Sequence, residues 1–147
     1  MPLSRLARLP LLPLLLASCD GEKPGDDTGF VDDGEPHIFI TAPEAGAAVS
    51  GCFDLVVEVY NFTLVNPVES PDVTPGEGHW HAVFGPRFFD CESDRCAIAL
   101  TEEVAADTTV TAQLVGSDHN DVENSLGDDV EDERTFAYDG EPCPDAR

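Results

Sequence analysis

Three histidines are the residues of this chain whose type and spacing could do chemistry. His79 and His81 lie two apart within residues 76–85, a segment of sequence Gly-Glu-Gly-His-Trp-His-Ala-Val-Phe-Gly, and His119 follows a later apolar segment. Side chains two apart on a strand project from the same face, so both imidazoles can reach one point. Three neutral imidazoles, at about 2.0 to 2.1 Å, suit zinc or copper and leave a fourth position for water or a carboxylate. The sequence therefore predicts a copper, zinc or small-ligand site at His79, His81 and His119.

Nearby carboxylates could complete such a site. Glu77, Asp118 and Asp121 are close enough in sequence to supply a fourth ligand or to hold the imidazoles in place. If the segment that ends before His119 pairs antiparallel with the one that carries His79, alternation places all three rings on one outer face. We therefore expect a three-histidine patch on the surface, surrounded by acidic groups.

A second interpretation stays open, in which these histidines are ordinary hydrogen-bonded surface residues. Glycines such as Gly76 and Gly78 beside them can be required by a tight turn alone. The chain would then be a non-catalytic structural or protein-interaction domain. Under either interpretation no enzyme is predicted, because the sequence has no Gly-x-Ser-x-Gly, phosphate loop or dinucleotide fingerprint, and no evident nucleophile beside a base.

The elements that must position the histidines are short strands. From His37 onward, runs rich in β-branched and aromatic residues alternate with clusters of Pro, Gly, Asp and Ser, and no ten-residue amphipathic helix is visible. In residues 76–85 the alternation directs Trp80, Ala82 and Phe84 inward. The clearest strands are expected at residues 37–41, 52–62, 76–85, 97–101, 108–117 and 134–138.

Several short strands with a tryptophan on a central one resemble an immunoglobulin-like or fibronectin-type domain. The resemblance implies an all-β fold, a single antiparallel β-sandwich of six to seven strands over residues 37–143, with a tail at 144–147. The histidine segment is also similar to small secreted bacterial domains that carry a Gly-His-x-His strand and a later Asp-His. The matching residues are Gly78, His79, His81, Asp118 and His119. That resemblance covers roughly residues 37–139 and implies no established activity.

The N-terminus indicates export. Arg5 and Arg8 precede a leucine-rich segment too short to span a bilayer, which is typical of a signal peptide over residues 1–18. Its end, Leu16-Ala17-Ser18-Cys19, resembles the lipobox of bacterial lipoproteins. The resemblance implies that Cys19 carries lipid and that the protein is anchored in the cell envelope, on the periplasmic or outer-surface side. Residues 19–36 are acidic and rich in glycine, and we expect them to form a disordered linker.

The other four cysteines suit two disulfides, since an oxidising compartment permits them. Three pairings are possible. The close spacing of Cys91 and Cys96 favours a staple across a hairpin. In a sandwich of this type Cys52 and Cys143 begin the second strand and follow the last, at one end of the molecule. We therefore favour Cys91 with Cys96 and Cys52 with Cys143.

The charge of the chain restricts its partners. Removal of residues 1–18 would leave five basic and 30 acidic residues, a net charge of −25. Nucleic acids are polyanions, so such a field excludes them as partners. A metal ion, an envelope protein and the membrane reached through lipid on Cys19 are the partners that remain.

Overall fold

The computed structural model describes residues 30–100 and 107–144. The predicted signal peptide, the lipobox and Cys19 lie outside the described residues. Within residues 30–100 and 107–144, no helix has the length and apolar character that a membrane span requires. The compact unit that contains the strands begins at Asp32, five residues before the predicted domain boundary at His37. The side-chain amide of Asn61 donates to the Asp32 carboxylate and to the Glu35 carbonyl, which attaches this segment to the domain.

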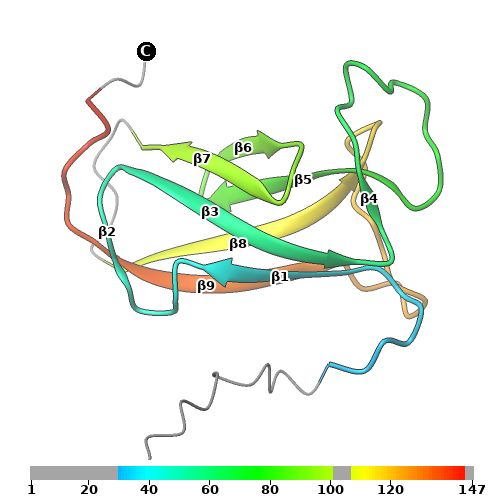
Figure 1. The fold of residues 1–147 in the computed structure, drawn as a ribbon, viewed down its shortest axis with the longest axis horizontal. Coiled ribbons are helices and arrows are strands. Elements are labelled where there is room, and N and C mark those ends of the chain that lie inside the picture. Colours follow the sequence, from blue (N-terminus) through cyan, green and yellow to red (C-terminus); the bar gives the residue numbers. More distant parts are fainter. Residues whose placement is uncertain (1–29, 101–106, 145–147) are drawn as a thin grey trace, which may run out of the picture. The chain divides into compact units, whose positions relative to one another are not determined.

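The described chain forms nine strands in two sheets (Figure 1), which confirms the predicted all-β sandwich. The smaller sheet has the order β1-β3-β7 and the larger has the order β2-β9-β8-β5-β4, with β6 also paired to β5. The strands are β1 (His37–Ala42), β2 (Ala48–Val49), β3 (Cys52–Tyr60), β4 (Thr63–Leu64), β5 (Glu77–Phe84), β6 (Arg87–Cys91), β7 (Arg95–Ala99), β8 (Asp107–Gly116) and β9 (Glu131–Tyr138).

Three strands were not predicted, and each has a physical reason. β2 and β4 have only two residues each, too few for alternation to be visible, and both pair in parallel with their neighbours. The sandwich is antiparallel, as predicted, apart from these two short contacts. β6 is longer and forms a hairpin with β5 across Gly85 and Pro86. The immunoglobulin-like or fibronectin-type classification stays a prediction.

The core lies between the sheets and consists of the side chains that alternation directs inward. Trp80, Ala82 and Leu114 are completely buried, and Leu55 of the facing sheet is buried as well. The indole Nε1 of Trp80 donates to the carbonyl of Ser93 at 2.7 Å, so the one polar atom of the ring is satisfied. Burial of a large apolar side chain such as Leu114 contributes about 1.5 to 3 kcal/mol, so the inner face of β5 packs firmly in the core and its outer face has a defined register.

Both predicted disulfides are present. Cys52 bonds to Cys143 and closes a separation of 91 residues, while Cys91 bonds to Cys96 over five residues. The smaller bridge joins the end of β6 to β7, and therefore connects the edge of the larger sheet to the smaller one. Two disulfides are typical of a protein that folds outside the reducing cytoplasm.

Candidate metal site

Strand β5 positions His79 and His81 beside β8. The register pairs Gly78 with Gly116 and His79 with Val115. A Cβ atom at Gly78 would collide with the carbonyl oxygen of Val115 and would meet the Phe62 ring at 2.9 Å. Glycine is therefore required here for the close approach of the two strands, and that approach brings the end of β8 to the histidine pair.

A tight turn after β8 brings His119 to the same place. The turn is closed by hydrogen bonds from Gly116 N to the Asn120 carbonyl at 2.9 Å and from His119 N to the Gly116 carbonyl at 3.0 Å. His119 adopts a left-handed backbone conformation, with φ of 59°, which is uncommon for a residue other than glycine. Its ring centroid lies 4.7 Å from that of His79 and 5.5 Å from that of His81. The three histidines therefore converge on one face of the larger sheet, as predicted.

The fourth member of the cluster is Asp90 of β6, which sequence reasoning missed. Asp90 is the register partner of His81, and its Oδ1 lies 3.0 Å from His81 Nε2 and 3.7 Å from His79 Nε2. A signal for β6 was present, because Gly85-Pro86 forms a two-residue loop between two runs rich in apolar and aromatic residues, the pattern of a β-hairpin. Recognition of that hairpin would have placed Asp90 opposite His81.

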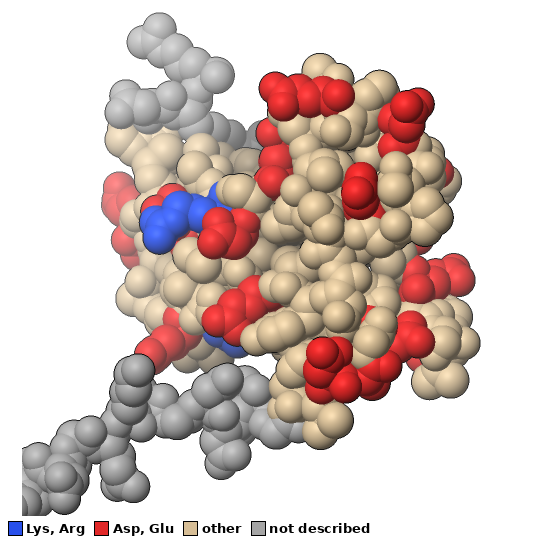
Figure 2. Space-filling model, turned by 45° about the vertical axis from the view of Figure 1, so that its right-hand side comes forward, with Lys and Arg blue, Asp and Glu red and all other residues tan. Residues whose placement is uncertain are grey.

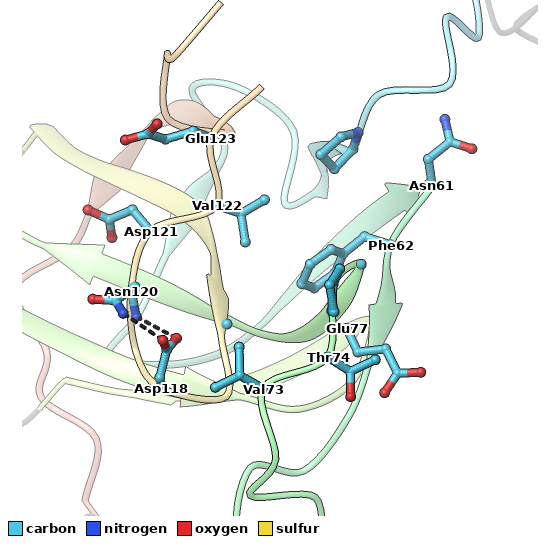
Figure 3. Close-up of a pocket in the computed structure, with 14 residues that line it drawn as sticks. Asn61, Phe62, Val73, Thr74, Glu77, Asp118, Asn120, Asp121, Val122 and Glu123 are labelled. Atoms are coloured by element: carbon cyan, nitrogen blue, oxygen red, sulfur yellow. Dashed lines mark hydrogen bonds between the residues drawn. The ribbon is translucent and has the colours of Figure 1, made fainter. Parts of the chain in front are cut away.

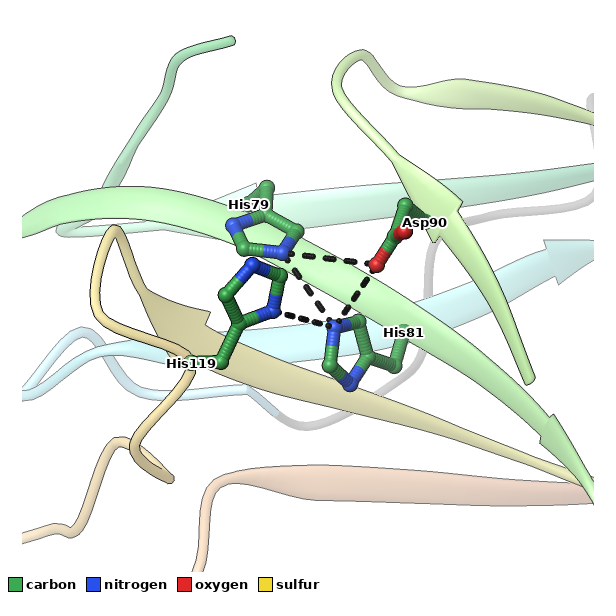
Figure 4. Close-up of side chains that lie close together, drawn as sticks. All are labelled: His79, His81, Asp90 and His119. Carbon is green, nitrogen blue, oxygen red and sulfur yellow. Dashed lines mark hydrogen bonds and ion pairs between the residues drawn. The ribbon is translucent and has the colours of Figure 1, made fainter. Parts of the chain in front are cut away.

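The four side chains present their ligand atoms to one another (Figure 4). His79 Nε2 lies 3.2 Å from His81 Nε2, and His119 Nδ1 lies 3.3 Å from the same atom. One potential ligand atom from each of His79, His81, Asp90 and His119 lies within 4.8 Å of all the others. Imidazole nitrogens and a carboxylate oxygen at such separations can coordinate a transition-metal ion.

Burial across the site is graded, which corrects the expectation of a surface patch. His79 is completely buried, the side chain of His81 is 14 % exposed and that of Asp90 is 52 % exposed. His119 is exposed. Any ion held by these groups would therefore have the buried ring of His79 on one side and solvent beside Asp90 and His119 on the other.

The electrostatics of the site favour neutral rings on β5. Burial lowers the pKa of His79, and the neighbouring rings of His81 and His119 lower it further. Burial also lowers the pKa of His81, and it outweighs the opposing effect of the Asp90 carboxylate. Both imidazoles are therefore neutral at pH 7 and keep a lone pair for a metal ion.

The predicted carboxylates Glu77, Asp118 and Asp121 are not members of the four-residue cluster. All three line a separate cavity of about 400 Å³ beside the turn, where the side chains of Phe62 and Val122 face each other (Figure 3). Asp118 accepts hydrogen bonds from the backbone and side-chain nitrogens of Asn120, which lower its pKa. Asp118 therefore stabilises the turn that carries His119, and the negative charge of Asp121 acts on His81 from a distance.

The negative charge of the protein favours cations. Figure 2 shows acidic side chains spread over the face drawn, with basic side chains confined to a small part of it. Such a field raises the local concentration of metal ions. Next to the site, the Phe88 ring lies 4.9 Å from that of His81 and is 59 % exposed, so it shields one side of the cluster.

Comparisons of the chain with protein-family models, with curated proteins and with solved structures found no match. What the chain can do must therefore be inferred from the geometry of the site.

Proposed function

We propose that this chain is a lipid-anchored domain of the cell envelope that binds a transition metal, copper or zinc, at His79, His81, Asp90 and His119. The observation that carries the proposal is the convergence of four potential ligand atoms within 4.8 Å. These atoms come from three separate segments, β5, β6 and the turn after β8. Binding is the proposed role, because all four side chains of the cluster are of types that coordinate metal ions.

The hydrogen-bonding capacity of the cluster supports a metal ligand set over incidental histidines. The Nε2 atom of His81 faces two imidazole nitrogens and one carboxylate oxygen. If it carries a proton, it can donate well to only one of them. If it carries a lone pair, that lone pair faces the lone pairs of the Asp90 oxygen. A cation between the four groups would satisfy all of their lone pairs at once.

Local strain supports the same interpretation. The left-handed backbone of His119 costs free energy relative to an ordinary turn residue, and such strain persists where the surrounding structure or a ligand requires it. The buried Nδ1 of His79 has no hydrogen-bond partner within the described part of the chain. A fold that only needed stability would gain from an apolar residue at that position.

Metal analysis tests the proposal. The protein is exported without a histidine tag, so that its disulfides form, and its metal content is compared with that of a His79→Ala, His81→Ala, His119→Ala triple variant. The His37→Ala variant is the matched control, because His37 is the one histidine outside the cluster. We expect about one equivalent of metal in the wild type and the control, and none in the triple variant. Equal and negligible copper and zinc in all three would leave the structural or interaction domain as the function.

The anchoring is tested separately. Replacement of Cys19 by Ser removes the thiol that the lipobox resemblance assigns to lipid, and we expect the variant to leave the membrane fraction. A variant that fractionates as the wild type does would remove the lipid anchor from the proposal and leave the metal site untouched.

A further inference from the structure

The geometry points to zinc as the metal, held by four protein ligands in a tetrahedral site: Nε2 of His79, Nε2 of His81, Nδ1 of His119 and Oδ1 of Asp90. This inference rests on the proposed metal-binding function and specifies which ion and which coordination it involves. Three observations carry it: the spacing of the ligand atoms, their chemical type and the position of Asp90.

The spacing fits a tetrahedron. With zinc bonds of about 2.0 to 2.1 Å, two ligand atoms of a tetrahedral site lie about 3.3 Å apart. His81 Nε2 lies 3.2 Å from His79 Nε2 and 3.3 Å from His119 Nδ1. The Asp90 oxygen lies 3.0 Å from His81 Nε2 and 3.7 Å from His79 Nε2. These four distances fall on either side of the ideal value, so an ion could enter with small movements of the side chains.

The same distances argue against a square plane, the arrangement typical of Cu(II). In a square plane every ligand has one partner on the opposite side of the metal, at about twice the bond length, or roughly 4 Å. His81 Nε2 has no such partner in this cluster, because its three neighbours lie at 3.0, 3.2 and 3.3 Å. An atom with three near-equal neighbours is instead at the corner of a tetrahedron.

The donor types separate zinc from Cu(I), which also accepts tetrahedral sites. Cu(I) is selected by soft thiolate and thioether ligands, whereas this cluster consists of three imidazoles and one carboxylate. Within the described residues the four cysteines are all in disulfides. Imidazole and carboxylate are common ligands of zinc.

Asp90 decides between a closed and an open centre. A catalytic zinc has three protein ligands and a water, whereas a structural zinc has four protein ligands. Asp90 occupies the fourth corner from β6, an edge strand that, among the described strands, pairs only with β5. Zinc would therefore join β5, β6 and the turn after β8, and it would hold these three segments together without an open position for substrate.

Cobalt substitution and copper spectroscopy test the inference. Co(II) replaces zinc readily, and its visible absorption is intense in a four-coordinate tetrahedral site and weak in an octahedral one. We expect intense bands from the Co(II)-loaded full-length protein, abolished by one equivalent of zinc.

The Asp90→Asn variant should bind cobalt more weakly, with altered bands. The matched control is Asp72→Asn, which removes an exposed carboxylate of the loop before β5 and should leave the spectrum unchanged. The side chain of Asp90 is 52 % exposed, and Asp72 lies on an exposed loop. Neither change should therefore prevent folding.

The outcomes separate the two levels of the proposal. Weak octahedral cobalt bands, or a Cu(II)-loaded form whose electron paramagnetic resonance spectrum is that of a regular square plane, would overturn tetrahedral zinc and leave a metal-binding domain. A spectrum unaffected by Asp90→Asn would overturn the assignment of the fourth ligand. No binding of cobalt, zinc or copper by the folded wild type would overturn the proposed function itself.

Discussion

At the residue scale, the candidate site consists of side chains whose individual positions are unfavourable without a common ligand. His79 is a polar residue with no exposure, and His119 adopts a left-handed backbone. Each of these features costs on the order of 1 to 3 kcal/mol. Coordination of one ion would offset part of these costs, because it engages Nε2 of the buried ring and requires the turn that presents His119, while Nδ1 of His79 stays unpaired.

Replacement of His119 by Asn separates the ligand from the turn. Asn tolerates a left-handed backbone, so the turn should persist, while the imidazole is lost. We expect the zinc affinity to fall by more than about 100-fold, since even changes to groups that only orient a ligand cost about 10- to 100-fold. The free energy of unfolding of the metal-free variant should lie within about 0.5 kcal/mol of that of the wild type. Isothermal titration with zinc and urea unfolding in EDTA measure the two quantities. Unchanged zinc affinity would show that His119 is not a ligand.

Replacement of His79 by Leu tests whether the buried ring is a cost to the metal-free fold. Leu fills similar volume and removes a buried nitrogen that lacks a partner, a group that typically costs about 1 to 3 kcal/mol. We expect the metal-free variant to be more stable than the wild type by about 1 kcal/mol and to gain nothing from added zinc. Urea unfolding with EDTA and with zinc provides the comparison. A variant much less stable than the wild type in EDTA would show that the imidazole contributes favourable packing that outweighs its desolvation.

At the scale of elements, the sequence predicts the strands that are long enough for alternation to be visible. It does not predict the shortest strands, or a ligand whose role depends on its partner in the neighbouring strand. Alternation in residues 76–85 places Trp80 in the core and His79 and His81 opposite, and the structure has this arrangement. The antiparallel pairing that joins His119 to them is also correct. Asp90 could not be assigned without β6, because a carboxylate becomes a candidate ligand only through its register partner. The ring of His79 packs against that of His119 from the turn after β8, and no local pattern in the sequence predicts this contact.

The disulfide of β6 should matter for the site more than for the fold. The Cys91–Cys96 bridge attaches β6 to β7 immediately beside Asp90, so its removal should allow Asp90 to move away from His81. In the chain-entropy model a loop this short contributes about 2 kcal/mol, against about 4 to 5 for the Cys52–Cys143 bridge. We expect the Cys91→Ala, Cys96→Ala variant to lose zinc affinity but remain folded.

The Cys52→Ala, Cys143→Ala variant is the matched control, because its bridge lies outside the cluster. It should lose more stability and, while folded, keep its zinc affinity. The measurements are zinc titration and thermal unfolding of both variants. An equal loss of zinc affinity in the two would mean that the bridges act through global stability alone.

At the scale of the whole molecule, the large negative charge and the buried imidazoles act on stability in opposite directions as the pH falls. Protonation of carboxylates relieves their mutual repulsion, and Glu131 is one example, because burial and the neighbouring Asp129, Glu133 and Asp121 raise its pKa. A group with a raised pKa in the folded state binds protons more readily there, so acid favours the fold through it. The two histidines of β5 behave in the reverse way.

The pH dependence of the metal-free protein therefore identifies the histidine contribution. Burial lowers the pKa of His79 and of His81 below the ordinary value of 6.5. Between that value and the folded pKa, the unfolded chain binds more protons than the folded one, so the free energy of unfolding decreases as the pH falls. The contribution is complete above about pH 6.5 and is lost below it, by at most about 1.4 kcal/mol per pH unit for each ring. Urea unfolding in EDTA from pH 7.5 to 5 should show this decline in the wild type and a shallower one in His79→Leu. The two proteins have the same carboxylates, so the difference between their slopes reports on the histidine. If the free energy of unfolding declines with equal slope in both, His79 is protonated as easily in the folded state as in the unfolded chain.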